Sequence, residues 1–326
     1  MKIIDLCEQT VPLSPCVATI GFFDGVHQGH RHLIGKVLAI ARRQQLASTV
    51  ITFSRHPRQV LQPDWHPQLL STFDEKVALL SQTGVDRLVV LPFDRQMAAL
   101  SASDFMERVL HRQLNVQVLV TGYDNHFGHR LPGSAEGFDD YVTYGRSMGM
   151  AVLQGDPLDV DAVRVSSSKV RKMLERGDVL QAAQCLGRPY ELSGVVVSGE
   201  HIGTALGFPT ANLQLSDTEK LIPAPGVYAV KARVGQSAEI WHGMMNIGSR
   251  PTFGGDHLTL ETHIFHFDGD LYGQPLTVSF VGRLRAEQKF ESREALAAQL
   301  AADARQAEIL LNSYFSNFIT TTNLTN

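Results

Sequence analysis

The feature that most restricts the fold is the alternation of short apolar runs with amphipathic stretches through the first half of the chain. Cys16–Gly21 is a short apolar run that ends in glycine, and His30–Arg43 follows it with its apolar side chains on one helical face. Ala47–Phe53 is again rich in β-branched residues. Short strands that alternate with helices predict βαβ units and a parallel sheet, in which ligands bind at the carboxyl ends of the strands.

The same alternation continues to about residue 186. The pattern predicts further strands at 86–92 and 116–122 and further helices at 74–82, 101–114, 137–148, 166–176 and 178–186. Ser101 with Asp104 three residues later predicts a capping box at the start of the helix 101–114. We therefore expect an α/β, Rossmann-like domain with a parallel sheet over residues 1–186.

A different pattern begins after residue 189, where the segments become short, alternating and rich in turns. The clearest is 258–265, whose alternation places Glu261 and His263 on the same face of a strand. Several short strands bounded by glycine and proline predict a small β-barrel or a sandwich, and we expect an antiparallel β-barrel. One long helix closes the chain, with Ser292 as its N-cap. We expect this second domain over residues 187–326.

The composition agrees with two globular domains and excludes several classes of protein. At about 100–200 residues per domain, 326 residues suggest two domains. A formal net charge of −4 argues against nucleic-acid binding as the main activity, and three cysteines without a CxxC pair argue against a disulfide framework. No apolar run approaches the roughly 20 residues that cross a bilayer. We therefore expect a cytoplasmic protein without nucleic-acid or membrane partners.

The loop Gly21–His30 lies between the first apolar run and the helix that follows it. Backbone N–H groups and the positive end of a helix meet there, and this is where a nucleotide places its phosphates. His27 and His30 are three residues apart, so both can face one phosphate and donate a hydrogen bond to the charge that develops on it. The alternative is a glycine-rich turn with two surface histidines. The strand before the loop and the helix after it favour phosphate chemistry.

A second glycine-rich segment, residues 199–212, lies in the other half of the chain. Its three glycines could wrap a phosphate with backbone N–H groups. Thr210 and Asn212 offer the hard oxygen ligands that suit Mg²⁺. The segment is neither GxGxxG nor a Walker loop, and a flexible hairpin loop is the alternative interpretation.

The string GFFDGVHQGH at residues 21–30 resembles the prokaryotic bifunctional riboflavin kinase/FAD synthetase family, and its HxGH is similar to that of adenylyl- and cytidylyltransferases. Six further segments resemble motifs of the same family in the same order: TFSRHP at 52–57, GYDNHFG at 122–128, VSSSKVR at 165–171, LGFPTANL at 206–213, NIGSRPTF at 246–253, and ETHIF at 261–265 followed by DLYG at 270–273. The resemblance spans about residues 15–305. Three positions depart from it: Arg55 stands where proline is usual, Asn125 where an aromatic residue is common, and Thr204 where arginine is common.

For the first half, the resemblance implies an FMN adenylyltransferase. ATP would bind at Gly21, Phe22, Phe23, Asp24, Gly25, His27, Gly29, His30, Ser166, Ser167 and Arg171. The implied catalytic groups among these are His27, His30, Ser167 and Arg171. The flavin would lie near His56, Pro57, Asp124 and Asn125.

For the second half, the resemblance implies a riboflavin kinase. Glu261 would be the general base that takes the proton from the ribityl 5′-hydroxyl, with Thr210 and Asn212 as ligands of Mg²⁺. ATP would bind at Gly199, Gly203, Gly207, Pro209, Thr210 and Asn212. The implied function is the ATP-dependent phosphorylation of riboflavin to FMN, followed by adenylylation of FMN with a second ATP to FAD and pyrophosphate. The implied partners are therefore riboflavin, FMN, FAD and ATP.

Two other functions fit parts of the sequence. A flavin-binding carrier or regulator that has lost one or both activities would explain the departures at Asn125 and Thr204. An HxGH transferase with a different acceptor would explain the first half. It would leave the PTAN segment of the second half, Pro209–Asn212, unexplained. A tRNA ligase is disfavoured by the acidic charge balance.

Overall fold

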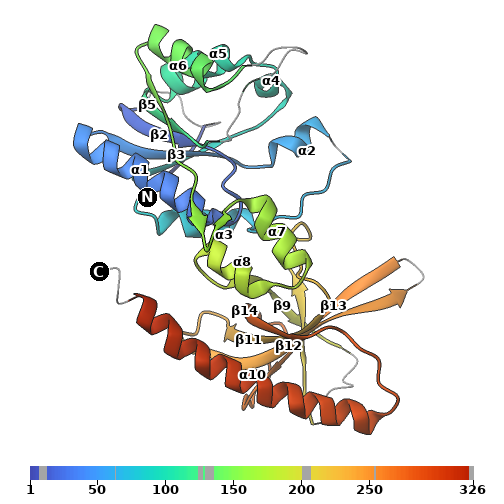
Figure 1. Ribbon diagram of the computed structural model, residues 1–326. Coiled ribbons are helices and arrows are strands. Elements are labelled where there is room, and N and C mark those ends of the chain that lie inside the picture. The colour runs from blue at the N-terminus through green and yellow to red at the C-terminus, as the bar shows by residue number, and fades with distance from the viewer. Residues whose placement is uncertain are drawn as a thin grey trace. The chain divides into compact units, whose positions relative to one another are not determined.

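The chain divides into two compact units, Met1–Ser167 and Ser168–Asn326, in the computed structural model (Figure 1). The structure describes residues 1–6, 13–62, 64–123, 128, 136–199, 207–252 and 255–322. Two helices, α7 (Ser167–Glu175) and α8 (Val179–Leu186), follow the end of the first unit, and α8 packs on strands of the second. The domain boundary expected at residue 186 stays a prediction.

The first unit contains a six-stranded sheet in which every paired strand is parallel, as the sequence predicted. The strand order is β1 (Lys2–Asp5), β4 (Arg87–Leu91), β3 (Ala47–Phe53), β2 (Cys16–Ile20), β5 (Val116–Thr121) and β6 (Ala151–Gln154). From β2 the chain proceeds to β3 and β4 on one side and later to β5 and β6 on the other. The strand order therefore reverses beside β2, and ligands of open parallel sheets bind at such a point.

Alternating side chains of these strands build two cores, one on each face of the sheet. Val17 and Val50 pack against α1 (Gln28–Gln44) and α3 (Phe73–Ser81). On the other face, Cys16, Ala18 and Ile20 pack in the core that includes the helical segments from residue 102 to 113 and α6 (Phe138–Ser147). Figure 1 shows these helices covering the two faces. Burial on both faces explains the runs of apolar residues in the central strands β2, β4 and β5.

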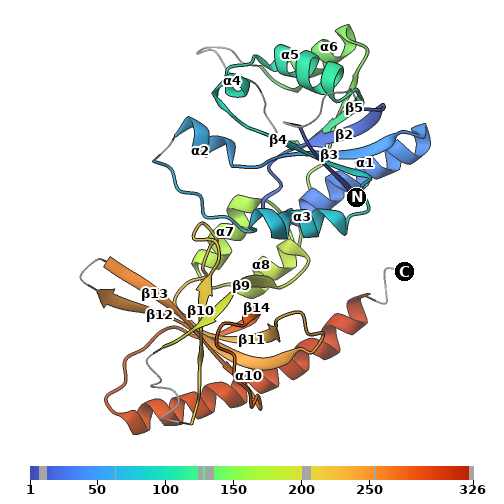
Figure 2. The same ribbon diagram turned by 180° about the vertical axis from the view of Figure 1, so that it is seen from behind.

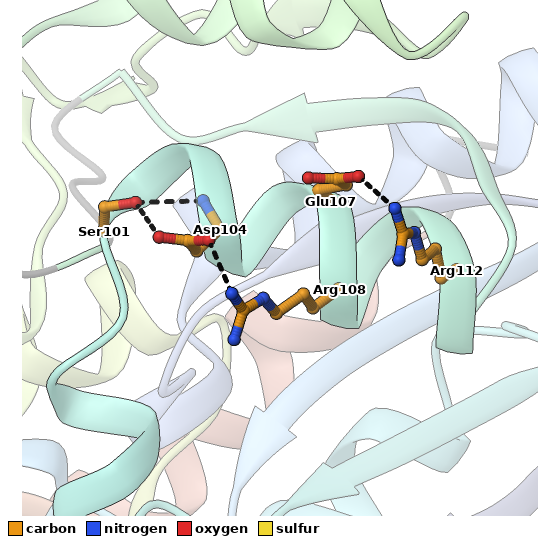
Figure 3. Close-up of polar contacts among 5 residues, drawn as sticks. All are labelled: Ser101, Asp104, Glu107, Arg108 and Arg112. Carbon is orange, nitrogen blue, oxygen red and sulfur yellow. Dashed lines mark hydrogen bonds and ion pairs between the residues drawn. The ribbon is translucent and has the colours of Figure 1, made fainter.

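The helix expected at 101–114 is present, but most of it is not α-helical. Ser101 caps α5 (Ala102–Phe105), because its Oγ accepts from the Asp104 N–H at 3.0 Å, and its own hydroxyl donates to Asp104 Oδ2 at 2.7 Å (Figure 3). The aspartate thus meets the hydroxyl of Ser101, where a full capping box would use the backbone N–H. The chain then continues as a π-helix, η2 (Met106–Gln113). Figure 3 also shows the exposed ion pairs Asp104–Arg108 and Glu107–Arg112 on this segment.

The second unit is a closed antiparallel barrel, which confirms the predicted architecture. Its strands follow the order β10 (Ala211–Leu215), β13 (Gly255–Ile264), β12 (Trp241–Thr252), β11 (Gly226–Val234), β14 (Pro275–Arg285) and β9 (Tyr190–Val197). Three of these strands are 10 to 12 residues long, longer than the short segments the sequence predicted. Tyr228 and Phe280 are buried and meet edge to face, with ring centroids 5.2 Å apart.

The terminal helix α10 (Arg293–Thr322) lies along the barrel (Figure 2). Ser292 caps it as predicted, because its Oγ accepts from the Ala295 N–H at 3.1 Å. Ala307 and Leu311 are fully buried against barrel residues. Other short elements of the described residues are η1 (Asp24–Val26), α2 (Pro57–Leu61), α4 (Arg95–Ala98), β7 (Asp159–Val160) and β8 (Val163–Arg164). Within the described residues, no helix is both long enough and apolar enough to span a membrane.

Candidate active sites

The loop Gly21–His30 leaves β2 at the point where the strand order of the sheet reverses. Phe23 and Val26 adopt left-handed backbone angles, with φ of 55° and 40°. A β-branched residue with positive φ costs free energy and persists only where its surroundings enforce it. Gly25, at φ 75°, lies between them and takes this conformation without strain. The loop is therefore held in one unusual shape, as phosphate-binding loops require.

The Asp24 carboxylate fixes this shape from inside the protein. It is 4% exposed and accepts from the Leu70 N–H at 2.9 Å and the Ser71 N–H at 3.1 Å. The Ser71 hydroxyl in turn accepts from the Gly25 N–H at 3.0 Å. Sequence reasoning placed Asp24 among the ATP-binding residues, and the structure places its carboxylate against the segment that precedes α3. Leu70 and Ser71 were not predicted, and no local sequence signal marks a contact between segments 46 residues apart.

His27 and His30 come together as the sequence predicted. His27 is the N-cap of α1, because its Nδ1 accepts from the His30 N–H at 3.2 Å. The two imidazoles stack with centroids 3.5 Å apart. Since Nδ1 of His27 is an acceptor, the neutral ring carries its proton on Nε2. Burial, together with the nearby His27 and Lys76, holds the pKa of His30 well below its ordinary value, so His30 is neutral at pH 7.

The segment Ser166–Ser168 contacts the same loop through Ser167. Its hydroxyl donates to the Asp24 carbonyl at 3.1 Å. Gly29 faces this segment too, since a side chain at position 29 would lie 3.2 Å from the His27 ring and 3.6 Å from the Val165 carbonyl oxygen. Ser167 is the first residue of α7, so Ser166 directly precedes the helix. Arg171 lies farther along α7, within the second unit.

The predicted flavin residues divide into two groups. His56 caps α2 and Pro57 is its first residue, directly after β3. The rings of His56 and Phe22 meet edge to face, with centroids 4.6 Å apart, so His56 lies beside the loop Gly21–His30. Asp124 and Asn125 lie outside the described residues.

The second unit places its candidate groups on neighbouring strands. Asn212 of β10 lies opposite Glu261 of β13, and Glu261 lies opposite Asn246 of β12. Directly opposed residues on antiparallel strands have their side chains about 5 Å apart on one face. Gly199 lies against the Asn212 amide, because a side chain at position 199 would come within 2.0 Å of its Nδ2. The sequence assigned no role to Asn246, and only the register of β12 reveals its place beside Glu261.

The PTAN segment is joined to the strand of Glu261 through His263. His263 Nδ1 lies 2.8 Å from the Pro209 carbonyl oxygen, which can only accept, so this nitrogen carries the ring proton. The Phe208 ring meets His263 edge to face, with centroids 5.3 Å apart. Burial is the main cause that lowers the pKa of His263. Gly207 has φ of 81° and begins the turn into this segment, and Gly203 and Thr204 lie outside the described residues.

The residues at this site fit Mg²⁺. Thr210 and Asn212 carry neutral oxygens, and the Glu261 carboxylate lies on the adjacent strand. Magnesium is usually held by one or two carboxylates together with waters and substrate phosphates, so it needs no closed protein cage. The described residues contain no cluster of three or more His, Cys, Asp or Glu side chains able to hold a metal ion. A site of this kind would bind the metal with its nucleotide.

Comparisons with known proteins cover nearly all of the chain. Residues 10–169 match the family described as FAD synthetase, and residues 186–311 match riboflavin kinase. The bifunctional riboflavin kinase/FMN adenylyltransferase of Pseudomonas fluorescens is 40% identical over 297 residues, which cover 90% of this chain and 93% of that protein. The protein of the same name from Escherichia coli K12 is 36% identical and covers 90% of this chain and 91% of its own length. A crystal structure titled macrolide-efflux protein, from Streptococcus pneumoniae, has a TM-score of 0.85 at 30% identity and covers 94% of this chain and 99% of that one.

Proposed function

The chain belongs to the family of bifunctional riboflavin kinases/FMN adenylyltransferases, and we propose that each of its two activities resides in one of the two sites described above. The enzyme is a riboflavin kinase and an FMN adenylyltransferase, with riboflavin, FMN, FAD and ATP as its substrates and products. Adenylyl transfer is assigned to the loop Gly21–His30. Phosphoryl transfer is assigned to the face of the barrel that bears Glu261.

At the first site, the FMN phosphate attacks the α-phosphorus of ATP. The new phosphorus–oxygen bond forms as the bond to the β-phosphate oxygen breaks, and pyrophosphate leaves. The loop N–H groups and the start of α1 favour the negative phosphates. His27 and His30 offer imidazole N–H donors to the charge that develops at the α-phosphate. Ser167 and Arg171 are proposed to contact phosphate oxygens as well.

At the second site, Glu261 is proposed to take the proton from the ribityl 5′-hydroxyl. The oxygen then attacks the γ-phosphorus of ATP, and ADP leaves. Thr210 and Asn212 would hold Mg²⁺, which when bound neutralises charge on the phosphate oxygens. Gly199, Gly203, Gly207 and Pro209 are proposed to line the nucleotide. Positioning and charge stabilisation dominate in this chemistry, so neither reaction requires a covalent enzyme intermediate.

The remaining assignments follow from the same premise. His56, Pro57, Asp124 and Asn125 are proposed to lie beside the flavin in the first site, and the contact of His56 with Phe22 supports the first pair. A cytoplasmic location without nucleic-acid or membrane partners is proposed from the composition and the biosynthetic activity. The carrier alternative is disfavoured, because His27 and His30 meet in one loop and Asn212 lies opposite Glu261.

The observation that supports two sites most strongly is that each unit contains its own candidate phosphate loop with its own polar partners. The direct test incubates the purified protein with riboflavin, Mg²⁺ and ATP and separates the flavins by chromatography. FMN should appear first and FAD after it, and FMN supplied in place of riboflavin should give FAD directly. If the protein bound flavin but formed neither FMN nor FAD, only the interpretation as a flavin-binding carrier or regulator would remain.

A further inference from the structure

A buried lysine, Lys76, lies at the base of the loop Gly21–His30. It belongs to α3 and is 2% exposed. A buried ammonium is stable only where protein groups replace its water. Its Nζ donates to the carbonyl oxygens of Phe22 and Phe53, both at 3.2 Å, and lies 4.0 Å from the centre of the Phe22 ring.

The two carbonyl acceptors mark the ends of adjacent strands. Phe53 is the last residue of β3, and Phe22 lies two residues beyond the end of β2. The parallel ladder between these strands ends at this edge, so its last carbonyls need other donors. Thr52 Oγ1 supplies a second donor to the Phe22 carbonyl, at 3.1 Å. Lys76 therefore joins two strand ends where the loop leaves the sheet.

Lys76 is also the last contact of a longer segment that supports the loop. The segment Leu70–Lys76 binds the Asp24 carboxylate at its start and the Phe22 carbonyl at its end. Between them, Thr72 and Glu75 form a capping box that fixes the start of α3. The loop is thus held at two points by one short stretch of chain, which lies directly before and within the first turns of a helix.

The charges that face Lys76 come from the loop and from α1. The Asp24 carboxylate favours the ammonium, while burial, the larger effect, lowers the pKa of Lys76 to about 8. At pH 7 the ammonium is therefore still the major form. The other titratable groups near Lys76 are His30 of α1 and His27, whose ring stacks on that of His30. The positive charge of Lys76 disfavours protonation of His30.

We propose that Lys76 is a positioning residue for adenylyl transfer, because its ammonium joins the ends of β2 and β3 and so sets the place of His27 and His30. The proposal rests on the assignment of adenylyl transfer to this loop. Lys76 acts through Phe22, Phe53 and His30 and is not assigned a contact with substrate. Its charge has a second, smaller effect, which adds to burial and to His27 in disfavouring protonation of His30.

The test compares Lys76→Met, which keeps the length of the chain without the charge, with Lys76→Arg, which keeps the charge. The control is Lys36→Met in α1, which removes a lysine paired with Asp156 at the surface of the same unit. Lys76→Met should lower the rate of FMN adenylylation by roughly 10- to 100-fold, as expected when reacting groups lose their placement. Lys76→Arg should recover most of this loss. Riboflavin phosphorylation should be unchanged in all three variants.

A spectroscopic measurement separates positioning from a general loss of structure. The ring resonances of His30, assigned by comparison with His30→Asn, should titrate at higher pH in Lys76→Met than in the wild type and be unchanged in Lys36→Met. Adenylylation within twofold of the wild type in folded Lys76→Met would overturn the proposal. If neither Lys76 variant folds, Thr52→Val decides, because it removes the other donor to the Phe22 carbonyl: slower adenylylation would support positioning of the loop through this carbonyl, and an unchanged rate would contradict it.

The parent assignment is tested in parallel by His30→Ala. If that variant still makes FAD from FMN, the loop is not the adenylyl site and the role of Lys76 fails with it. If His30→Ala is inactive while folded Lys76→Met is fully active, only the role of Lys76 fails.

Discussion

The two candidate sites position their reactive groups in different ways. In the first unit, His27 and His30 lie in a loop beyond the end of a strand, and a separate segment, Leu70–Lys76, fixes that loop through buried polar contacts. In the second unit, Asn212 and Glu261 lie within paired strands, so the register of the barrel sets their separation. A parallel sheet offers its ligand site at the strand ends, where the ladder has stopped. An antiparallel barrel can position reactive groups on its hydrogen-bonded strands themselves.

This difference has an energetic consequence. The first site depends on two groups that are expensive to bury, the Asp24 carboxylate and the Lys76 ammonium. The residues around the second site are less buried, and in the described part of its loop the links to the strand of Glu261 are a hydrogen bond from His263 to the Pro209 carbonyl and a ring contact between His263 and Phe208. We therefore expect substitutions to act on stability and activity together in the first unit and mainly on activity in the second.

The largest effect is expected at the proposed general base. Glu261→Gln keeps the shape of the side chain and removes its basicity, so riboflavin phosphorylation should fall by about 10²- to 10⁴-fold. FMN adenylylation should be unchanged, as measured with FMN as substrate. Glu239→Gln, at an exposed position of the same unit, is the matched control. Unaltered FMN production by Glu261→Gln would refute the assignment of the base.

His30→Ala should lower FAD formation by about 10²- to 10³-fold, the range typical for loss of one donor to developing charge. FMN should still accumulate from riboflavin, because phosphorylation is assigned to the other unit. His32→Ala, two residues along and exposed, serves as the control. Loss of both products in a folded His30→Ala protein would contradict the division into two sites.

The buried lysine should make the stability of the first unit depend on pH. The pKa of Lys76 is about 8 in the folded protein against an ordinary 10.5, so between these values the unfolded chain binds more protons than the folded one. The free energy of unfolding of the wild type, relative to Lys76→Met, should therefore rise as the pH increases from 8 to 10.5, by about 3 kcal/mol in all. Below pH 8 the difference should be constant.

Denaturant unfolding measures this difference. Trp65 lies in the first unit and Trp241 in the second, so fluorescence in a Trp241→Phe background reports on the first unit alone. Lys36→Met should show no such change with pH. A stability difference between wild type and Lys76→Met that fell with rising pH would mean that the ammonium is not buried as described.

The smallest effect is expected at His263. His263→Leu removes the hydrogen bond to the Pro209 carbonyl, which is worth about 1 kcal/mol, so kcat/KM for ATP in riboflavin phosphorylation should fall roughly 3- to 10-fold. His263→Asn retains a donor on a short side chain and should lose less. FMN adenylylation should not change in either variant. An effect of His263→Leu on adenylylation alone would show that the PTAN segment serves the other reaction.

Local sequence patterns predicted most of the fold. The β-branched runs gave β2 and β3 to within a residue, and the 3.6-residue period gave α1, because these signals arise within one element. The meeting of His27 with His30 was predictable for the same reason. The π-helical form of η2 was not predicted, since the apolar pattern of residues 106–113 does not distinguish it from an α-helix.

The supports of each site could not be predicted, because they depend on contacts between distant segments. Lys76 directly follows Asp74 and Glu75 at the start of a predicted helix, where a charged residue is ordinary, so only the fold shows that it reaches the ends of two strands. Asn246 lies beside Glu261 through the register of β12 with β13. These strands are consecutive and Thr252 lies opposite Gly255, so the place of the turn sets their register, and the sequence pattern did not predict that place.

The most direct test of two independent sites mixes two variants that are each impaired in one reaction. Glu261→Gln should make FMN and His30→Ala should adenylylate it only at the strongly lowered rates given above, so neither alone should form appreciable FAD from riboflavin and ATP. Together they should restore FAD, with free FMN passing from the second protein to the first, because each unit performs its own reaction. If both variants fold and each binds flavin but the mixture forms no FAD, two independent sites in one chain would be contradicted.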